Sequence, residues 1–186
     1  MIAYRKEKID NAMCYFAAEH HNRTGRYLSQ TILFKYLAYL DFMSLKDVGR
    51  PSLELEYKAM DNGPVPHKLY NRRKNYKTSL VEFVPRGNGK YIIKAKKNAN
   101  LDYFSKYEIK KMDELLTKYA DLNITEKDIS DRICKDSHVE IRAWDIAYKK
   151  EKNSIINYED TFEDLLNKPE DELTLTEEKF LSYKYW

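Results

Sequence analysis

The residues best suited to chemistry are four histidines, one of which lies close to a carboxylate in the sequence. His138 and Glu140 are two positions apart, and a histidine beside a carboxylate can act as a general acid and base. A hydrolase or transferase would also need an activated nucleophile, a phosphate-binding loop or paired carboxylates, and the sequence contains none of these motifs. We therefore expect that the protein is not an enzyme.

The other histidines and the cysteines do not have the spacing of metal ligands, which would recur at i, i+3 or i+4 or in Cys-x-x-Cys motifs. His20 and His21 end a predicted helix, where we expect them to cap the helix or to face solvent. Cys14 and Cys134 fall in separate helical stretches, and we expect reduced thiols packed among neighbours. No metal and no cofactor is predicted.

Two stretches of the chain are rich in Lys and Arg with tyrosines between them. Residues 66–77 and 86–97 hold these cations: Lys68, Arg72, Arg73, Lys74, Lys77, Arg86, Lys90, Lys94, Lys96 and Lys97. Positive charge interleaved with aromatic rings suits single-stranded nucleic acid, although a solvated surface has the same composition. Nucleic-acid binding through Arg72, Arg73 and Lys74 is a secondary alternative, because the sequence has no helix-turn-helix or RNA-binding motif.

Hydrophobic periodicity and capping residues predict the elements that position these groups. Helices are expected over residues 6–20 and from Ser29 to Gly49. Three more are expected to begin after Pro66, at the capping box of Ser105 and Glu108, and at Thr125, the last of them short. Residues 79–84 and 90–94 read as strands of a hairpin around Gly87-Asn88-Gly89. The fold class is mainly α: a compact multi-helix domain with one small antiparallel β-hairpin inserted near residues 79–95.

Charge and composition divide the chain in two. Residues 151–186 carry ten acidic and four basic residues, whereas residues 1–150 carry 29 basic and 20 acidic residues. We expect a domain over 1–150 and an acidic C-terminal extension over 151–186, with weak helices at 158–166 and 176–185, packed on the domain or flanking it. The start resembles no signal peptide and no apolar run is long enough to span a membrane, which predicts a cytoplasmic protein that does not contact membranes.

Two segments together carry a resemblance to a known family. They read KYLAYLDFMSLKDVGRPSLELEYKAMDNGPVPHKLYN and, after the hairpin, ISDRICKDSHVEIRAW. Their order and spacing over residues 6–150 resemble the Panacea domain, also called the SocA-like antitoxin domain. In this pattern Tyr57-Lys58-Ala59 is expected in a helix, Gly63-Pro64 in a turn that aims the basic helix 67–77, and residues 136–140 in a loop. The chain departs from the family where Ile141-Arg142-Ala143 replaces the usual proline before Trp144.

The resemblance implies a mostly helical antitoxin that neutralises a cognate protein toxin by direct contact. A protease-adaptor role, a nucleic-acid-binding regulator and self-association are the alternatives. The positions that match the family's motifs, with two neighbours, form the predicted toxin-binding set: Gly63, Pro64, Val65, His67, Tyr70, His138, Glu140 and Trp144.

Overall fold

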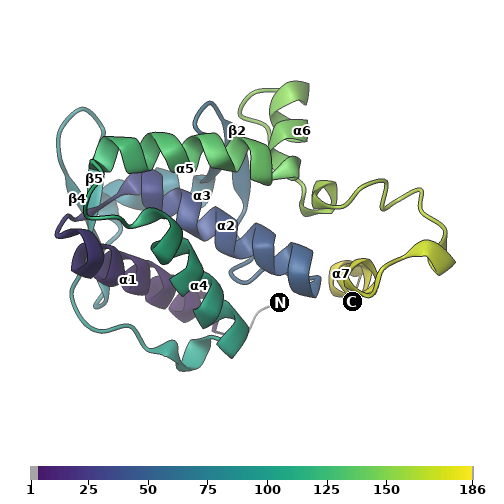
Figure 1. The fold of residues 1–186 in the computed structure, drawn as a ribbon, viewed down its shortest axis with the longest axis horizontal. Helices are drawn as coiled ribbons and strands as arrows, with labels where there is room; N and C mark the ends of the chain where they lie inside the picture. Colours follow the sequence, from purple (N-terminus) through teal and green to yellow (C-terminus); the bar gives the residue numbers. More distant parts are fainter. Residues whose placement is uncertain (1–3, 186) are drawn as a thin grey trace.

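The fold is built around one long helix whose residues from Ile32 to Leu45 are almost all buried. The computed structural model describes residues 4–185. The α-helices within that range are α1 (Arg5–Thr24), α2 (Gln30–Val48), α3 (His67–Arg72), α4 (Lys106–Tyr119), α5 (Glu126–Glu140), α6 (Arg142–Lys150) and α7 (Leu175–Tyr185). Figure 1 shows α2 in the middle, with α1 and α4 on one side of it and α5 on the other. The expected mainly helical class is confirmed.

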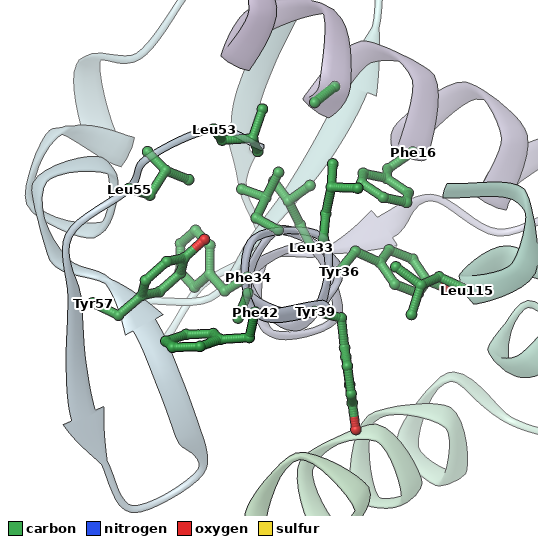
Figure 2. Close-up of a cluster of buried hydrophobic side chains, with 14 of the residues drawn as sticks. Phe16, Leu33, Phe34, Tyr36, Tyr39, Phe42, Leu53, Leu55, Tyr57 and Leu115 are labelled. Carbon is green, nitrogen blue, oxygen red and sulfur yellow. The ribbon is translucent and has the colours of Figure 1, made fainter. Parts of the chain in front are cut away.

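Helix α2 begins where the sequence predicted. The Ser29 hydroxyl accepts the backbone N–H of Ile32 at 3.4 Å, and Gly49 ends the helix in the left-handed conformation at φ 79°. Figure 2 looks along α2 and shows apolar side chains around its whole circumference, from Phe16 and Leu115 on one side to Tyr57 on the other. A helix enclosed in this way organises the core of the domain.

The predicted hairpin is present and joins a third strand. Strands β4 (Val81–Pro85) and β5 (Tyr91–Ala95) are antiparallel, and Gly87, Asn88 and Gly89 between them all have positive φ. The short strand β1 (Leu28–Ser29) pairs with the other edge of β5, so the sheet order is β1-β5-β4. The sheet contacts α1 and α2.

A second hairpin was missed, and the expected helix at Tyr57-Lys58-Ala59 is wrong. Strands β2 (Tyr57–Met60) and β3 (Gly63–Pro66) are antiparallel, with Ala59 opposite Pro64. Buried residues alternate with more exposed ones from Leu53 to Met60, which is the period of a strand. The expected turn therefore lies at Asp61-Asn62, and Gly63 and Pro64 belong to a strand.

Helix α5 is longer than expected, and the loop expected at residues 136–140 is wrong. Thr125 caps it as predicted, but Ile129, Ile133 and Ser137 bury one continuous face, so the helix runs on to Glu140. The next helix, α6, follows after the single residue Ile141. His138 and Glu140 therefore lie in the last turn of a helix.

The C-terminal extension packs against the domain. The helix expected at 158–166 is only a 3₁₀ turn (Tyr158–Thr161), whereas α7 matches the second predicted piece. The backbone of Ser154 and Ile156 pairs with β2: Ala59 N–H donates to Ser154 O and Ile156 N–H to Tyr57 O, both at 2.9 Å. Helix α7 contacts α2, so the extension adds both sheet pairing and helix packing to the domain.

Candidate functional site

Gly63 lies where β3 meets α2 and α5, and a larger residue there would displace the neighbouring side chains. Its φ is 97°, and an added Cβ would lie 2.5 Å from Ser137 Oγ and 2.8 Å from Lys35 Cε. Both constraints favour glycine, because L-residues rarely adopt this φ and no Cβ tolerates such contacts. Gly63, Pro64 and Val65 are all buried. The motif that the sequence singled out is thus the packing junction of three elements.

Lys35 is the group at this junction that sequence analysis missed. Its side chain is 1% exposed, and Nζ donates to the Pro64 carbonyl at 3.0 Å. Removal of the ammonium from water lowers the pKa of Lys35 to about 8. The only sequence signal was a lysine inside the apolar run Ile32 to Leu40, which could equally have been an exposed position on the helix.

His138, Trp144 and Tyr148 form a stack of aromatic rings on the α5–α6 corner. The His138 ring lies 4.0 Å from Trp144 with only 5° between the planes, and Tyr148 stacks on Trp144 at 4.7 Å. The Trp144 indole N–H donates to Met60 O at 3.1 Å, and the Tyr148 hydroxyl donates to Asp61 Oδ1 at 2.8 Å. These bonds tie α6 to the β2–β3 turn. Burial, with a smaller effect of the Lys35 charge, lowers the pKa of His138.

Glu140 does not join this stack. Its carboxylate accepts from Lys118 Nζ of α4 at 2.7 Å. His138 Nε2 is buried and has no hydrogen-bond partner among the described residues. The acid–base pair that the spacing of His138 and Glu140 allowed is therefore not formed.

The remaining predicted residues lie around α3. His67 Nε2 is 2.9 Å from Glu56 Oε1, and Tyr70 carries the Arg73 guanidinium 3.6 Å above its ring. Arg72 and Lys74 are exposed beside it. Of the eight predicted toxin-binding residues, Gly63, Pro64 and Val65 lie in the β2–β3 hairpin, and the stacked His138 and Trp144 lie against it. Glu140, His67 and Tyr70 have other neighbours.

His20 differs from its expected place at a helix end or in solvent. It is fully buried, and α1 continues beyond it to Thr24. Its ring nitrogens lie 3.3 Å from the Tyr36 hydroxyl and 3.2 Å from Glu126 Oε2. The side chain therefore links α1 to α2 and to the start of α5.

Asp41 is a second buried charge that sequence analysis missed. Its carboxylate accepts the backbone N–H groups of Leu53, Glu54 and Leu55 and, at 2.8 and 3.2 Å, the hydroxyls of Tyr57 and Tyr158. Burial raises the pKa of Asp41, and these hydrogen bonds oppose the rise. Asp41 thereby fixes the segment before β2 and one residue of the C-terminal extension.

A groove of about 500 Å³ lies between α2, α4 and the α5–α6 corner. Tyr39, Phe42 and Met43 line it from α2, while Val139 and Glu140 line it from α5. Val139 is 80% exposed, more than any other large apolar side chain described between residues 4 and 185. An exposed aliphatic side chain beside an apolar floor with charged neighbours is the composition of a protein-binding surface.

Within residues 4–185, no three His, Cys, Asp or Glu side chains are grouped as a metal ion would require. None of the helices in this range combines the length and the apolar composition needed to cross a bilayer.

Comparison with known families gives one match. The model for "Antitoxin SocA-like, Panacea domain" matches residues 33–137, which is more than half of the chain. The match contains most of α2, both hairpins, α4 and most of α5, and it ends immediately before His138. Comparison with curated proteins and with solved structures gives no significant match.

Proposed function

Because the chain belongs to the family of SocA-like antitoxins with a Panacea domain, we propose that it is the antitoxin of a toxin–antitoxin pair and neutralises a protein toxin by binding it directly. Direct neutralisation requires a surface that is complementary to the toxin and needs no catalytic group of the antitoxin. The toxin would therefore contact an exposed surface of this chain.

The observation that carries the proposal is the groove beside Val139. Buried apolar contact at the centre of an interface provides most of its binding energy, and charged residues at the rim limit the choice of partner. Val139 offers an exposed apolar side chain, and Glu140, held by Lys118, provides charge next to it. The stretch between the predicted residues His138 and Trp144 thus includes one edge of this groove, although Val139 itself was not among the predicted contacts.

The buried members of the predicted set have a different role in this proposal. Gly63, Pro64 and Val65 are buried and Trp144 is 5% exposed, so a toxin would reach them only after a rearrangement. We assign to them the positioning of α5 and α6. The stack and the Trp144–Met60 hydrogen bond fix the corner at which the exposed Val139 lies.

A second cavity of about 500 Å³, between the C-terminal extension and the segment before β2, is a weaker candidate. Its charged groups already have partners within the chain, because Arg5 pairs with Glu54 and Lys184 with Glu159. A partner would only exchange these partly exposed ion pairs for others, so the charges at this cavity would contribute little to binding.

Val139→Arg tests the groove. Arginine is compatible with the last turn of a helix, where a cation interacts well with the helix dipole, but it places a charge in an apolar contact. We expect the variant to melt like the wild type and to bind the toxin about 2 kcal/mol more weakly, roughly thirtyfold in Kd. The assay pairs the chain with the product of the adjacent reading frame, measuring growth rescue, co-purification and Kd.

Leu122→Arg is the matched control. Leu122 is 64% exposed, and it precedes α5 whereas Val139 lies near its end. Equal rescue and equal Kd for both variants would remove the groove from the proposal. A neighbouring product that is neither toxic alone nor co-purified would remove the proposed function. Loss of the toxin from cells without co-purification would favour the protease-adaptor alternative.

A further inference from the structure

The positive charge of the domain comes from one segment. Residues 66–97 contain ten Lys and Arg residues and a single acidic residue, Glu82, whereas the rest of residues 1–150 contains nineteen basic and nineteen acidic residues. Because the excess of basic residues is confined to about a fifth of the domain, the positive potential is local to this segment and does not extend over the whole domain.

The fold brings the two basic stretches of this segment together. The 3₁₀ turn η1 (Arg73–Asn75) that follows α3 contacts β4, and Phe83 N–H donates to Tyr76 O at 3.4 Å. Arg73 of the first stretch reaches the second one, because its guanidinium lies 3.6 Å above Tyr70 and 5.4 Å from the Tyr91 ring of β5. We call the surface formed by residues 67–97, which comprise α3, η1, β4, β5 and the turns between and after them, the basic face.

Most cations of the basic face have no acidic partner. Lys68 pairs with Glu56 and Lys77 with Glu82. Among the residues the structure describes, five exposed side chains of the basic face have neither an acidic group within 4.0 Å nor a hydrogen bond: Arg72, Lys74, Arg86, Lys90 and Lys97. Cations without partners within the chain are available to bind anions.

A hollow of about 410 Å³ continues the basic face beyond the end of β5. Lys96, Lys97 and Asn98 line it together with His21 and Tyr27, whose rings stack at 4.8 Å. Amide, ammonium and aromatic groups in one hollow match the sugar, phosphate and base of a nucleotide.

We propose that the basic face binds nucleic acid through its phosphate backbone. An acidic protein is the competing partner, but protein interfaces depend on exposed aromatic or apolar anchors. Of the large apolar side chains of the basic face and its hollow, only Tyr27 is exposed, at 40%. Interfaces with nucleic acid are more polar and more positively charged, which agrees with this surface.

The site would bind independently of the toxin. Figure 1 shows the β4–β5 hairpin at the opposite end of the molecule from the C-terminal extension, and the groove beside Val139 includes no residue of the basic face. The helix α3 has only six residues, so we expect binding to the backbone without reading of base sequence.

Fluorescence anisotropy with a labelled DNA of about 20 nucleotides, single-stranded and as a duplex, tests the proposal. We expect the logarithm of the binding constant to fall linearly with the logarithm of salt concentration between about 50 and 200 mM, with a slope of about −0.9 per contacted phosphate on the duplex. The variant Arg86→Glu/Lys90→Glu, at the exposed hairpin turn, should weaken binding at least about tenfold and reduce the slope by about two.

Lys106→Glu/Lys110→Glu is the matched control, because it makes the same change of charge in α4, away from the basic face. Neutral Arg86→Gln/Lys90→Gln replaces the reversal variant if that variant melts below the wild type. Absence of DNA binding at low salt would overturn the proposal. It would also be overturned if the α4 control lost as much affinity for DNA as the hairpin variant. Displacement of the DNA by polyglutamate at equal charge concentration would assign the face to an acidic protein instead.

Discussion

Lys35 carries a buried ammonium group that donates one hydrogen bond, to the Pro64 carbonyl, and within residues 4–185 no carboxylate lies within 4.0 Å of it. Burial of such a charge costs free energy, and a lowered pKa records this cost. In the unfolded chain the pKa of a lysine is 10.5, and in the folded protein that of Lys35 is about 8. Between these values the folded state binds fewer protons than the unfolded state, so stability should rise with pH in this window.

Lys35→Met is expected to remove this dependence. The wild type should gain stability relative to the variant from pH 8 upward, by up to about 1.4 kcal/mol per pH unit. Below pH 8 the difference should be constant, because both folded and unfolded lysine are protonated there. Urea unfolding at pH 7, 8, 9 and 10 measures this difference, in which the titration of the tyrosines cancels.

Lys46→Met is the control for Lys35, since it removes an exposed lysine from the same helix. Its stability curve should run parallel to that of the wild type. If the pH dependence of stability in Lys35→Met is also parallel to that of the wild type, Lys35 is hydrated in solution rather than buried.

At the scale of elements, the ends of helices show what the sequence could and could not predict. Ser29, Ser105 and Thr125 were predicted caps and are caps, because an N-cap is a local hydrogen bond between neighbours. The strand β2 was missed although apolar and charged residues alternate from Leu53 to Ala59. It has only four residues, and its partner β3 is Gly-Pro-Val-Pro, whose residue types do not indicate a strand. The end of α5 depends on burial against β3, which local sequence does not contain.

The candidate site was predictable only where residue type alone indicated a role, and not where the role depends on packing between distant segments. Gly63 and Trp144 stand out by residue type, and both belong to the site: Gly63 lies in β3, and Trp144 of α6 donates a hydrogen bond to β2 of the same hairpin. Lys35, Asp41 and Val139 are ordinary residue types in helices, and only the packing of distant segments makes two of them buried and one exposed. Tertiary contact, rather than any motif, decides their role.

Gly49→Ala is the prediction at this scale. Gly49 and Gly25 both end helices with positive φ, but a Cβ at Gly49 would lie 2.6 Å from Thr176 O, whereas one at Gly25 meets nothing within 4 Å. Gly25→Ala should therefore lose only the cost of the left-handed conformation, about 1 kcal/mol. Gly49→Ala should lower the free energy of unfolding by more than this, because α7 must also move.

Limited proteolysis combined with urea unfolding distinguishes the two glycine variants. Cleavage between Asn167 and Leu175 should be faster in Gly49→Ala than in the wild type and unchanged in Gly25→Ala. If both variants lose the same stability and resist protease equally, α7 does not pack on Gly49 in solution.

At the scale of the whole molecule, charge separation was predictable and the packing of the extension was not. The excess of acid in 151–186 is plain in the sequence, and Figure 1 shows this segment at the end of the molecule opposite the basic hairpin. That its backbone pairs with β2, and that Tyr158 donates to the buried Asp41, depends on contacts over about a hundred residues of sequence.

Phe180→Ala tests how strongly the extension is bound. Phe180 is 2% exposed and packs on Phe162 with ring centroids 5.2 Å apart. Truncation of a buried aromatic residue should cost about 3 kcal/mol of unfolding free energy, measured by urea denaturation. Leu175→Ala, in the same helix but 65% exposed, should change it by less than about 0.5 kcal/mol. Equal, small effects would mean that the extension is not part of the folded core.

The pairing of residues 154–156 with β2 has a consequence for the order of events during synthesis. Lys58 bridges Ile155, so one edge of the β2–β3 hairpin is completed by residues translated 97 positions later. Until those residues leave the ribosome, β2 exposes unpaired backbone groups that another strand can occupy. The nascent antitoxin-family domain therefore passes through a stage with an open sheet edge, and the last fifth of the chain closes it.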